Sequence, residues 1–171
     1  MTIIGELDIR ACSENDSADI HAIINDGARA YRGVIPADRW HEPYMSADAL
    51  TREIADGVHF WAALHEGRML GVMGVQDKGD VALVRHAYVK TIARRQGVGS
   101  ALLRFIQART GKPILIGTWR DASWAISFYE KHGYRIQSPG ATRRLLGHFW
   151  RVPDRQAETS VVLASPDWPQ G

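Results

Sequence analysis

Residues 81–103 read VALVRHAYVKTIARRQGVGSALL, and this stretch decides how the rest of the chain is interpreted. Its apolar first part predicts a strand, and its last part begins a helix with one apolar face. In the loop between them, Gly97 and Gly99 let backbone amides approach a ligand with no Cβ in the way. The helix start adds unpaired amides and the positive end of its dipole. With Arg94 and Arg95 beside them, these features predict a site for a pyrophosphate or a similar anion.

The length, charge and cysteine content of the chain argue against several classes of protein. The 171 residues fit one domain that can bury a core without disulfides or metal. The 21 basic and 19 acidic residues nearly cancel, so we expect neither bulk nucleic-acid binding nor a polybasic membrane segment. Cys12 is the single cysteine, the start MTIIGELDIR lacks a signal-peptide pattern, and no apolar run nears the roughly 20 residues of a membrane span. We therefore expect a cytoplasmic protein.

The element pattern predicts a mixed α/β fold around one sheet. A hairpin turn at Gly67 and a second turn before Val81 predict an antiparallel three-stranded meander. A loop with a short helical turn is expected over 30–45, where Gly33 and Pro36 interrupt any long helix. Strands are predicted over 7–11, 58–64, 69–76, 81–89, 114–117, 134–136 and 159–164. Helices are predicted over 20–28, 46–57, 98–109, 122–132 and 145–150.

Two pieces of this sequence together resemble the GNAT superfamily of acyl-CoA-dependent N-acetyltransferases. The first, RRQGVGSALL, is similar to the family's Q/R-x-x-G-x-G/A pattern, and the second, AISFYEKHGY, to its A-x-x-F-Y-x-x-x-G-F/Y pattern. The residues that match are Arg94, Gly97, Gly99, Ala125, Phe128, Tyr129, Gly133 and Tyr134. The resemblance covers residues 6–137, and the C-terminal part resembles a bacterial subgroup of the family.

The resemblance implies one N-acetyltransferase domain over 1–171. Its core, 6–137, would carry the cofactor motifs, and 138–171 would complete the acceptor side. The implied fold is a GNAT-like mixed sheet, with an antiparallel meander plus splayed parallel strands, flanked by helices.

Acetyl-CoA is the acyl donor that the resemblance implies. Backbone amides of the glycine loop would hold its pyrophosphate, and the end of the preceding strand would pair with the pantetheine arm as a further strand does. The family often has Asn at the position of Ala122, so that Ser123 or Asp121 replaces this contact or the contact is lost. The implied cofactor residues are Tyr88, Val89, Arg94, Arg95, Gln96, Gly97, Val98, Gly99, Ser100, Ser123 and Phe128.

The resemblance places Tyr129 near the sulfur, where a phenol donates a proton to the leaving thiolate. A buried core tyrosine is the plainer interpretation. Many family members carry Glu on the strand before the loop, but residues 83–86 have none. His86 is the nearest side chain that ordinarily titrates near neutral pH, although a histidine there can simply pack in the sheet. Glu42 and His41 are the other candidate bases, and a water chain can replace a direct base.

The segment 30–44 mixes aromatic and charged residues and is expected on the acceptor side, with 145–151 opposite. Its aromatic side chains either line the acceptor pocket or form a sheltered cluster with Phe149. Arg32 and Arg39 either bind a substrate carboxylate or are solvated. The candidate acceptor residues are Arg32, Trp40, His41, Tyr44 and Trp150. The histidines form no zinc spacing with Cys12, so no metal is expected.

The sequence thus predicts transfer of an acetyl group from acetyl-CoA directly to a primary amine of a small molecule. Three alternatives stay open. One is an acyl-CoA sensor on the same fold without turnover. Another is an interaction module with an exposed patch of Trp40, Tyr44 and Trp150, and the third is acetylation of a protein amine. We expect a monomer or a homodimer, because the C-terminal strand offers an edge for pairing.

Overall fold

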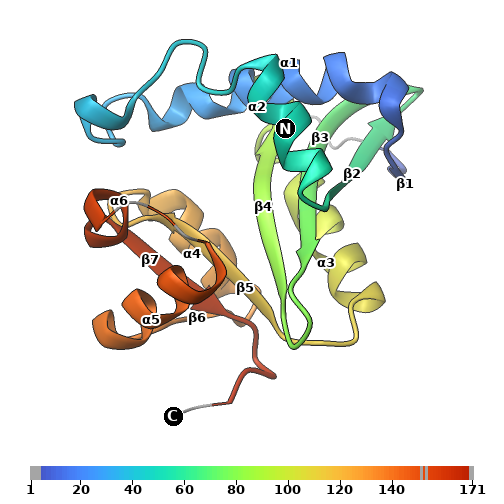
Figure 1. Cartoon of the computed structure of the whole chain (residues 1–171). Coiled ribbons are helices and arrows are strands. Elements are labelled where there is room, and N and C mark those ends of the chain that lie inside the picture. Colours follow the sequence, from blue (N-terminus) through green and yellow to red (C-terminus); the bar gives the residue numbers. More distant parts are fainter. Residues whose placement is uncertain (1–4, 151, 153, 170–171) are drawn as a thin grey trace. The chain divides into compact units, whose positions relative to one another are not determined.

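The computed structural model describes residues 5–150, 152 and 154–169 (Figure 1). The strands are β1 (Asp8–Ala11), β2 (Val58–His65), β3 (Arg68–Asp77), β4 (Ala82–Val89), β5 (Ile114–Trp119), β6 (Arg135–Ile136) and β7 (Ser160–Ala164). The α-helices are α1 (Ser17–Ala28), α2 (Ala47–Ala55), α3 (Val98–Arg109), α4 (Ser123–Lys131), α5 (Pro139–Phe149) and α6 (Asp154–Glu158). Short 3-10 turns lie at Glu14–Asp16, Arg29–Tyr31, Ala37–Arg39 and Thr91–Ala93. Within the described ranges, every helix is too short or too polar to cross a bilayer.

The strands form one seven-stranded sheet in the order β1-β2-β3-β4-β5-β7-β6. It is mostly antiparallel with one parallel pair, which confirms the predicted mixed sheet with a meander. The chain also divides into two compact units. The first comprises the described parts of Met1–Ala30, His41–Asp77 and Val84–Gly111, and the second those of Tyr31–Trp40, Lys78–Leu83 and Lys112–Gly171.

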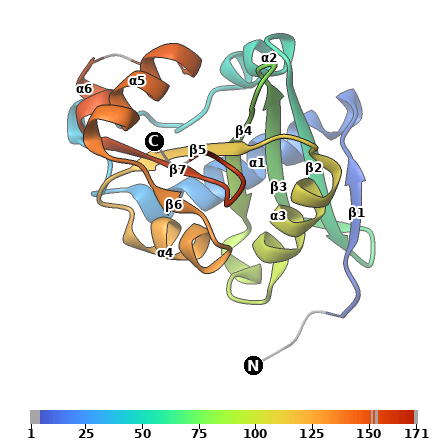
Figure 2. The same ribbon diagram turned by 90° about the horizontal axis from the view of Figure 1, so that it is seen from below.

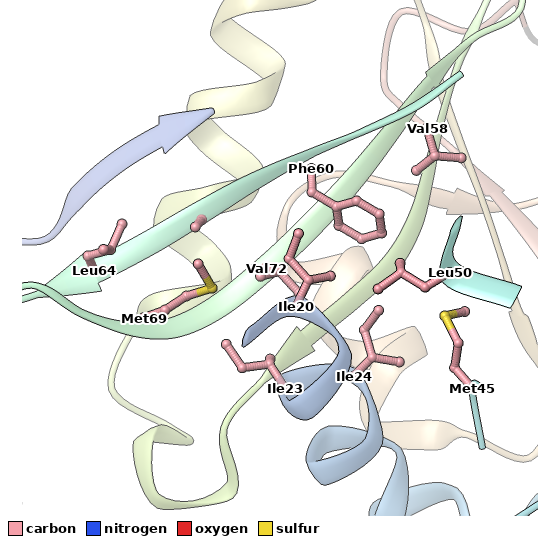
Figure 3. Close-up of a cluster of buried hydrophobic side chains, with 11 residues drawn as sticks. Ile20, Ile23, Ile24, Met45, Leu50, Val58, Phe60, Leu64, Met69 and Val72 are labelled. Carbon is pink, nitrogen blue, oxygen red and sulfur yellow. The ribbon is translucent and has the colours of Figure 1, made fainter. Parts of the chain in front are cut away.

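In the first unit, helices cover both faces of the meander. Alternate side chains of β2 point to opposite faces, as strand geometry requires. Phe60 and Leu64 join the buried cluster with α1, whereas Trp61 packs on Phe105 of α3 with ring centroids 5.2 Å apart. Figure 3 shows the α1 side of this core. The buried cluster consists of Ile20, Ile23, Ile24, Met45, Leu50, Val58, Phe60, Ala62, Leu64, Met69 and Val72.

The end of the 30–45 loop is fixed to α1 by side-chain hydrogen bonds. The Asn25 side chain accepts from the Met45 amide at 2.9 Å and donates to the Met45 carbonyl at 3.0 Å. Helix α2 then begins at once, because Ser46 caps it by accepting from the Ala49 amide at 3.1 Å. The position of α2 is therefore set by α1 and by this cap.

In the second unit, α5 and α6 pack on one side of strands β5, β7 and β6, and α4 lies on the other side (Figure 2). Val81, Leu83, Leu115, Leu146, Val162 and Ala164 form the buried cluster under α5. Helix α5 begins earlier than the predicted 145, because Ser138 accepts from the Ala141 amide and Pro139 occupies the first turn. Helix α6 was not predicted; its five residues are too few for a periodic signal.

Asp16 ties β1 to the start of α1. Its carboxylate accepts from Arg10 Nη1 at 2.8 Å, from Arg10 Nη2 at 3.0 Å and from the Ser13 amide at 2.7 Å. The hydrogen bonds from Arg10, followed by that from the Ser13 amide, lower the pKa of Asp16 to about 2. A lowered folded-state pKa adds stability that is present above the ordinary carboxyl value and is lost as pH falls toward 2.

We therefore predict that Asp16→Asn lowers the free energy of unfolding at pH 7 by about 1 kcal/mol. The loss should shrink as pH falls from about 4 toward 2, because the wild-type carboxylate then becomes protonated as well. Urea unfolding at both ends of this range measures it. Asp19→Asn is the control, since Asp19 is an exposed carboxylate in the first turn of the same helix. An equal deficit for Asp16→Asn at every pH would contradict the assignment.

Candidate functional site

The glycine loop has the geometry of an anion site. Arg95 and Gly97 both have left-handed backbone, with φ of 60° and 84°, and Gly97 is the N-cap of α3. A Cβ built on Gly97 would meet no atom within 4 Å, so the space outside this position is open to a ligand. The first helical hydrogen bond runs from the Ala101 amide to the Gly97 carbonyl at 3.0 Å. The amides of Val98 and Gly99 precede it and have no acceptor within the helix.

The charge around this loop is positive, and its base is anchored. Arg94 and Arg95 are exposed. Gln96 is half-buried and donates from Nε2 to the Ile92 carbonyl at 3.3 Å. The Thr91 amide and hydroxyl both donate to Asp26 Oδ2 of α1, at 2.7 and 3.0 Å. The loop thus offers open amides and two arginines on a fixed base, as an anion site requires.

Strand β4 carries an unusual backbone at His86, whose φ is 55°. A non-glycine residue with left-handed backbone costs about 1–2 kcal/mol and is commonly found at functional sites. Strand β3 has glycines beside this irregularity. A Cβ on Gly74 would lie 2.8 Å from the Arg85 carbonyl oxygen, and one on Gly71 would lie 3.2 Å from that of Tyr88. The two glycines therefore give the distorted strand room to approach β3.

A chain of polar side chains connects β3, β4 and α2. The buried Gln76 donates from Nε2 to the Asp56 carbonyl at 2.9 Å and accepts from Arg85 Nη1 at 3.1 Å. Arg85 Nη2 in turn donates to Glu53 Oε1 at 3.3 Å. The other carboxylate oxygen, Oε2, lies 3.2 Å from His86 Nε2. The chain therefore contacts α2 twice, at Glu53 within the helix and at Asp56, its C-cap.

The contact between Glu53 and His86 joins two buried side-chain atoms, and it is an ion pair only when His86 is protonated. Its length is that of a hydrogen bond, but its direction is outside hydrogen-bond geometry, and neither atom has another partner among the described residues. The Phe60 ring stacks on the imidazole at a centroid distance of 6.3 Å. Burial acts to raise the pKa of Glu53, but the contact with His86 and the charge of Arg85 outweigh it and hold that pKa below its ordinary value. Glu53 is therefore a carboxylate at neutral pH.

Two tyrosines adjoin this polar chain. The rings of Tyr44 and Tyr88 meet edge to face with centroids 6.2 Å apart. Burial, more than the nearby charge of Glu53, raises the pKa of Tyr44, although contact with Tyr88 acts the other way. Helix α1 passes closely over Tyr88, since a Cβ on Gly27 would lie 2.9 Å from its side chain. Tyr44, Tyr88 and His86 thus lie in one region of the first unit.

Glu53 is the residue that the sequence analysis missed. The family resemblance points to a carboxylate on the strand before the loop, whereas Glu53 comes from α2. One signal was present, because Glu53 follows the buried Leu50 by three positions and so lies toward the covered side of a short helix. An acidic residue at such a position is unusual, but the sequence does not indicate which strand residue it faces.

In the second unit, Tyr129 of α4 is buried, with 7% of its surface exposed. Its ring contacts Phe128 and Tyr134, at centroid distances of 5.0 and 5.9 Å. Burial, followed by the nearby Tyr31 and Tyr134, raises the pKa of Tyr129 far above that of a free phenol. Tyr129 is therefore a neutral hydrogen-bond donor. Ala122, where the resemblance expects Asn, is fully buried, and Ser123 is exposed.

The candidate acceptor residues divide between the two units. His41 and Glu42 are exposed and Tyr44 is half-buried in the first unit, whereas Arg32 is exposed and Trp40 and Trp150 are half-buried in the second. Trp150 and Phe149 pack against the core under α5. Arg151 lies outside the described residues. The large hydrophobic side chains that are exposed in the described part of the chain are Ile54, Ile92, Trp124 and Ile136. These do not include the three aromatic residues of the predicted patch.

No three histidine, cysteine or acidic side chains of the described residues are grouped so that they could hold a metal ion.

Comparisons with known proteins bear on the family resemblance and on the fold. Residues 56–136 match the family model of the acetyltransferase (GNAT) domain. This segment includes the glycine loop, His86 and Tyr129. A search of curated proteins gives no significant match.

Solved structures share the fold. A PaiA N-acetyltransferase from Thermoplasma acidophilum, in complex with coenzyme A, superposes with a TM-score of 0.70 at 18% identity, over 94% of this chain and 98% of the other. The ribosomal-protein-S18-alanine N-acetyltransferase of Escherichia coli gives 0.64 at 17% identity, over 97% of each chain. N-acetylglutamate synthase from Neisseria gonorrhoeae, with coenzyme A and N-acetyl-glutamate, gives 0.62 at 18%, over 94% of this chain and 35% of that one. Residues 56–136 thus match the GNAT acetyltransferase domain, in agreement with the resemblance of the two motifs, and the chain shares the fold of N-acetyltransferases of known structure.

Proposed function

We propose that this GNAT acetyltransferase moves an acetyl group from acetyl-CoA directly to a primary amine of a small molecule. The observation that carries the proposal is the loop before α3. It combines an open left-handed N-cap at Gly97, two amides without a helical acceptor and two exposed arginines. A pyrophosphate needs this combination of amide donors and positive charge.

The other proposed contacts with the cofactor are made by the backbone of the loop, by the end of β4 and by α4. The pyrophosphate accepts hydrogen bonds from amides between Gln96 and Ser100, with Arg94 and Arg95 beside it. The pantetheine arm pairs with the backbone at Tyr88 and Val89, which are partly buried at the end of β4. Ser123 and Phe128 of α4 complete the proposed set. Two of the structures with the same fold, those from Thermoplasma and Neisseria, contain coenzyme A.

The reaction forms a C–N bond and breaks the C–S bond of the thioester. A protonated amine first loses one proton to a base, and its nitrogen then attacks the carbonyl carbon. The nitrogen loses a second proton as the thiolate leaves, and the thiolate gains one from a donor. We assign that donor to Tyr129, because burial keeps its phenol protonated until the thiolate forms and can take the proton. An amide near Tyr88 or Val89 polarises the carbonyl.

His86 and Glu42 are the candidate bases. His86 is half-buried and faces a carboxylate, whereas Glu42 is exposed on the loop before α2. A base shielded from bulk water is better placed to take a proton from a bound amine. We therefore favour His86, and Glu42 with His41 becomes part of the proposed acceptor region together with Arg32, Trp40, Tyr44 and Trp150.

The acceptor class remains a proposal of its own. The structures with this fold include enzymes named for a ribosomal-protein alanine and for glutamate. The nearly balanced charge of this chain favours neither a large acidic nor a large basic protein partner. We propose a small amine, a cytoplasmic location and a monomer or homodimer.

Two measurements test the proposal. Calorimetric titration with acetyl-CoA should show saturable binding, and a thiol-release assay across amino acids, polyamines, aminoglycosides and peptides should show turnover with one class. Absence of acetyl-CoA binding overturns the proposed function. Binding without turnover for any amine supports a sensor instead, and turnover confined to peptides supports acetylation of a protein.

We predict that Gly97→Val weakens acetyl-CoA binding by at least about tenfold, which corresponds to about 1.4 kcal/mol. A valine resists the left-handed backbone, and its side chain fills the open space in front of the amides. Gly67→Val is the matched control, because Gly67 also has left-handed backbone and no atom within 4 Å, but lies in the β2–β3 turn. Equal affinities for wild type and Gly97→Val would show that the loop is only a turn.

We predict that Tyr129→Phe lowers kcat by about 100-fold while acetyl-CoA affinity changes little. The substitution removes only the hydroxyl that protonates the thiolate and keeps the packed ring. Tyr134→Phe is the control, since Tyr134 is a buried tyrosine in the same aromatic group. Steady-state thiol release and calorimetry separate the two effects. Full turnover by Tyr129→Phe removes Tyr129 as the acid.

A further inference from the structure

We infer that Glu53 is a positioning residue. Its carboxylate keeps the hydrogen of the neutral His86 imidazole on Nε2, so that Nδ1 takes the proton that the acceptor amine gives up. The inference deepens the proposed function and rests on it. It also assigns a role to a residue of α2 that neither the motifs nor the fold indicates.

The contact itself carries the first step. Glu53 Oε2 and His86 Nε2 are 3.2 Å apart, both are buried, and neither has a hydrogen-bond partner within the described part of the chain. A buried carboxylate oxygen repels a nitrogen lone pair at this distance and attracts an N–H. The hydrogen of the neutral ring therefore lies on Nε2. The lone pair that accepts a proton is then on Nδ1.

The carboxylate is held in place from behind. Its second oxygen accepts from Arg85 at 3.3 Å, Arg85 donates to Gln76 at 3.1 Å, and Gln76 donates to the Asp56 carbonyl at 2.9 Å. Because Asp56 is the C-cap of the helix that carries Glu53, the chain closes on α2. Glu53 therefore has little freedom to turn away from His86.

The imidazole is also restrained from its own side. Phe60 stacks on its face with an interplanar angle of 27°. The left-handed backbone at His86 directs the side chain differently from those of an ordinary strand residue. The charged and titratable side chains that lie around the His86 imidazole are those of Glu53, Arg85, Tyr44 and Tyr88. Arg85 is already paired with Glu53, and burial keeps Tyr44 neutral, so Glu53 supplies the charge next to the ring.

In the reaction, His86 Nδ1 takes one proton from the ammonium group of the acceptor, and the resulting imidazolium is stabilised by Glu53. The free amine then forms the C–N bond as the C–S bond breaks. The nitrogen also loses a second proton, which makes up for the proton that the thiolate gains. The imidazolium then releases its own proton to water. The sum is an ammonium ion plus a thioester giving an amide, a thiol and one free proton.

The tautomer is tested without turnover. Long-range proton–nitrogen NMR distinguishes the two neutral forms of a histidine ring, and the His86 signals are identified by their absence in His86→Asn. Asparagine suits this purpose because it tolerates left-handed backbone better than most residues. We expect the Nε2–H form in the wild-type protein at high pH and a mixture in Glu53→Gln. A wild-type ring with hydrogen on Nδ1 overturns the inference.

Kinetics tests the role. We expect His86→Asn to lower kcat by about 10²- to 10⁴-fold and Glu53→Gln by about 10- to 100-fold. In Glu53→Gln, the pH profile of kcat/KM should change, because the carboxylate beside the proposed base is gone. In a protein that already carries His86→Asn, Glu53→Gln should lower kcat only slightly further, since the two residues act as one unit. Asp48→Asn, an exposed carboxylate on the same helix, should leave both rate and profile unchanged.

The outcomes separate this inference from the proposed function. If the wild-type protein binds no acetyl-CoA and releases no thiol with any amine, the proposed function fails and the role of His86 fails with it. If the wild type turns over and His86→Asn does so equally well, the inference fails and the proposed function stands. A deficit in Glu53→Gln that leaves the pH profile in place, or that adds fully to His86→Asn, shows that Glu53 only stabilises the fold.

Discussion

The distorted backbone of β4 depends on two missing side chains in the neighbouring strand. At Gly74 and Gly71, a Cβ would lie 2.8 and 3.2 Å from carbonyl oxygens of β4, so any larger residue would push the strands apart. Because β4 can approach this closely, His86 can adopt left-handed backbone within a strand. The energetic cost of that conformation is offset by the packing and the polar contacts around it. The site in the first unit is built on this close approach.

Polar groups rather than apolar packing then define the region around His86. A buried carboxylate is unfavourable unless it is paired, and Glu53 is paired with both Arg85 and His86. Arg85 needs a second acceptor, which Gln76 provides, and Gln76 reaches the backbone of α2. Each group satisfies the next, so the arrangement is specific. Removing one member would leave another buried and unpaired, which usually costs more than the contact contributed.

Much of this could be predicted from the sequence, because the signals are local. The loop at Gly97 was recognisable from its glycines, its arginines and the helix that follows, and the strands of the meander from their turns. The start of α5 was predicted too late, because the cap at Ser138 lies before the apolar residues that were used to place the helix. Glu53 was missed for a different reason. Its partner is 33 positions away on another element, and periodicity carries no information about such contacts.

The sequence by itself determined the mixed α/β fold and the match to the GNAT domain, and it predicted an anion site at the loop, since each rests on spacing within a few residues. Only the tertiary structure decided what His86 faces. That depends on how closely β4 approaches β3 and on where Asn25 and Ser46 fix the start of α2. These are long-range packing constraints, and they are met only when the chain has folded. The glycine loop thus gave the cofactor half of the proposed chemistry, and the fold supplied the carboxylate behind the proposed base.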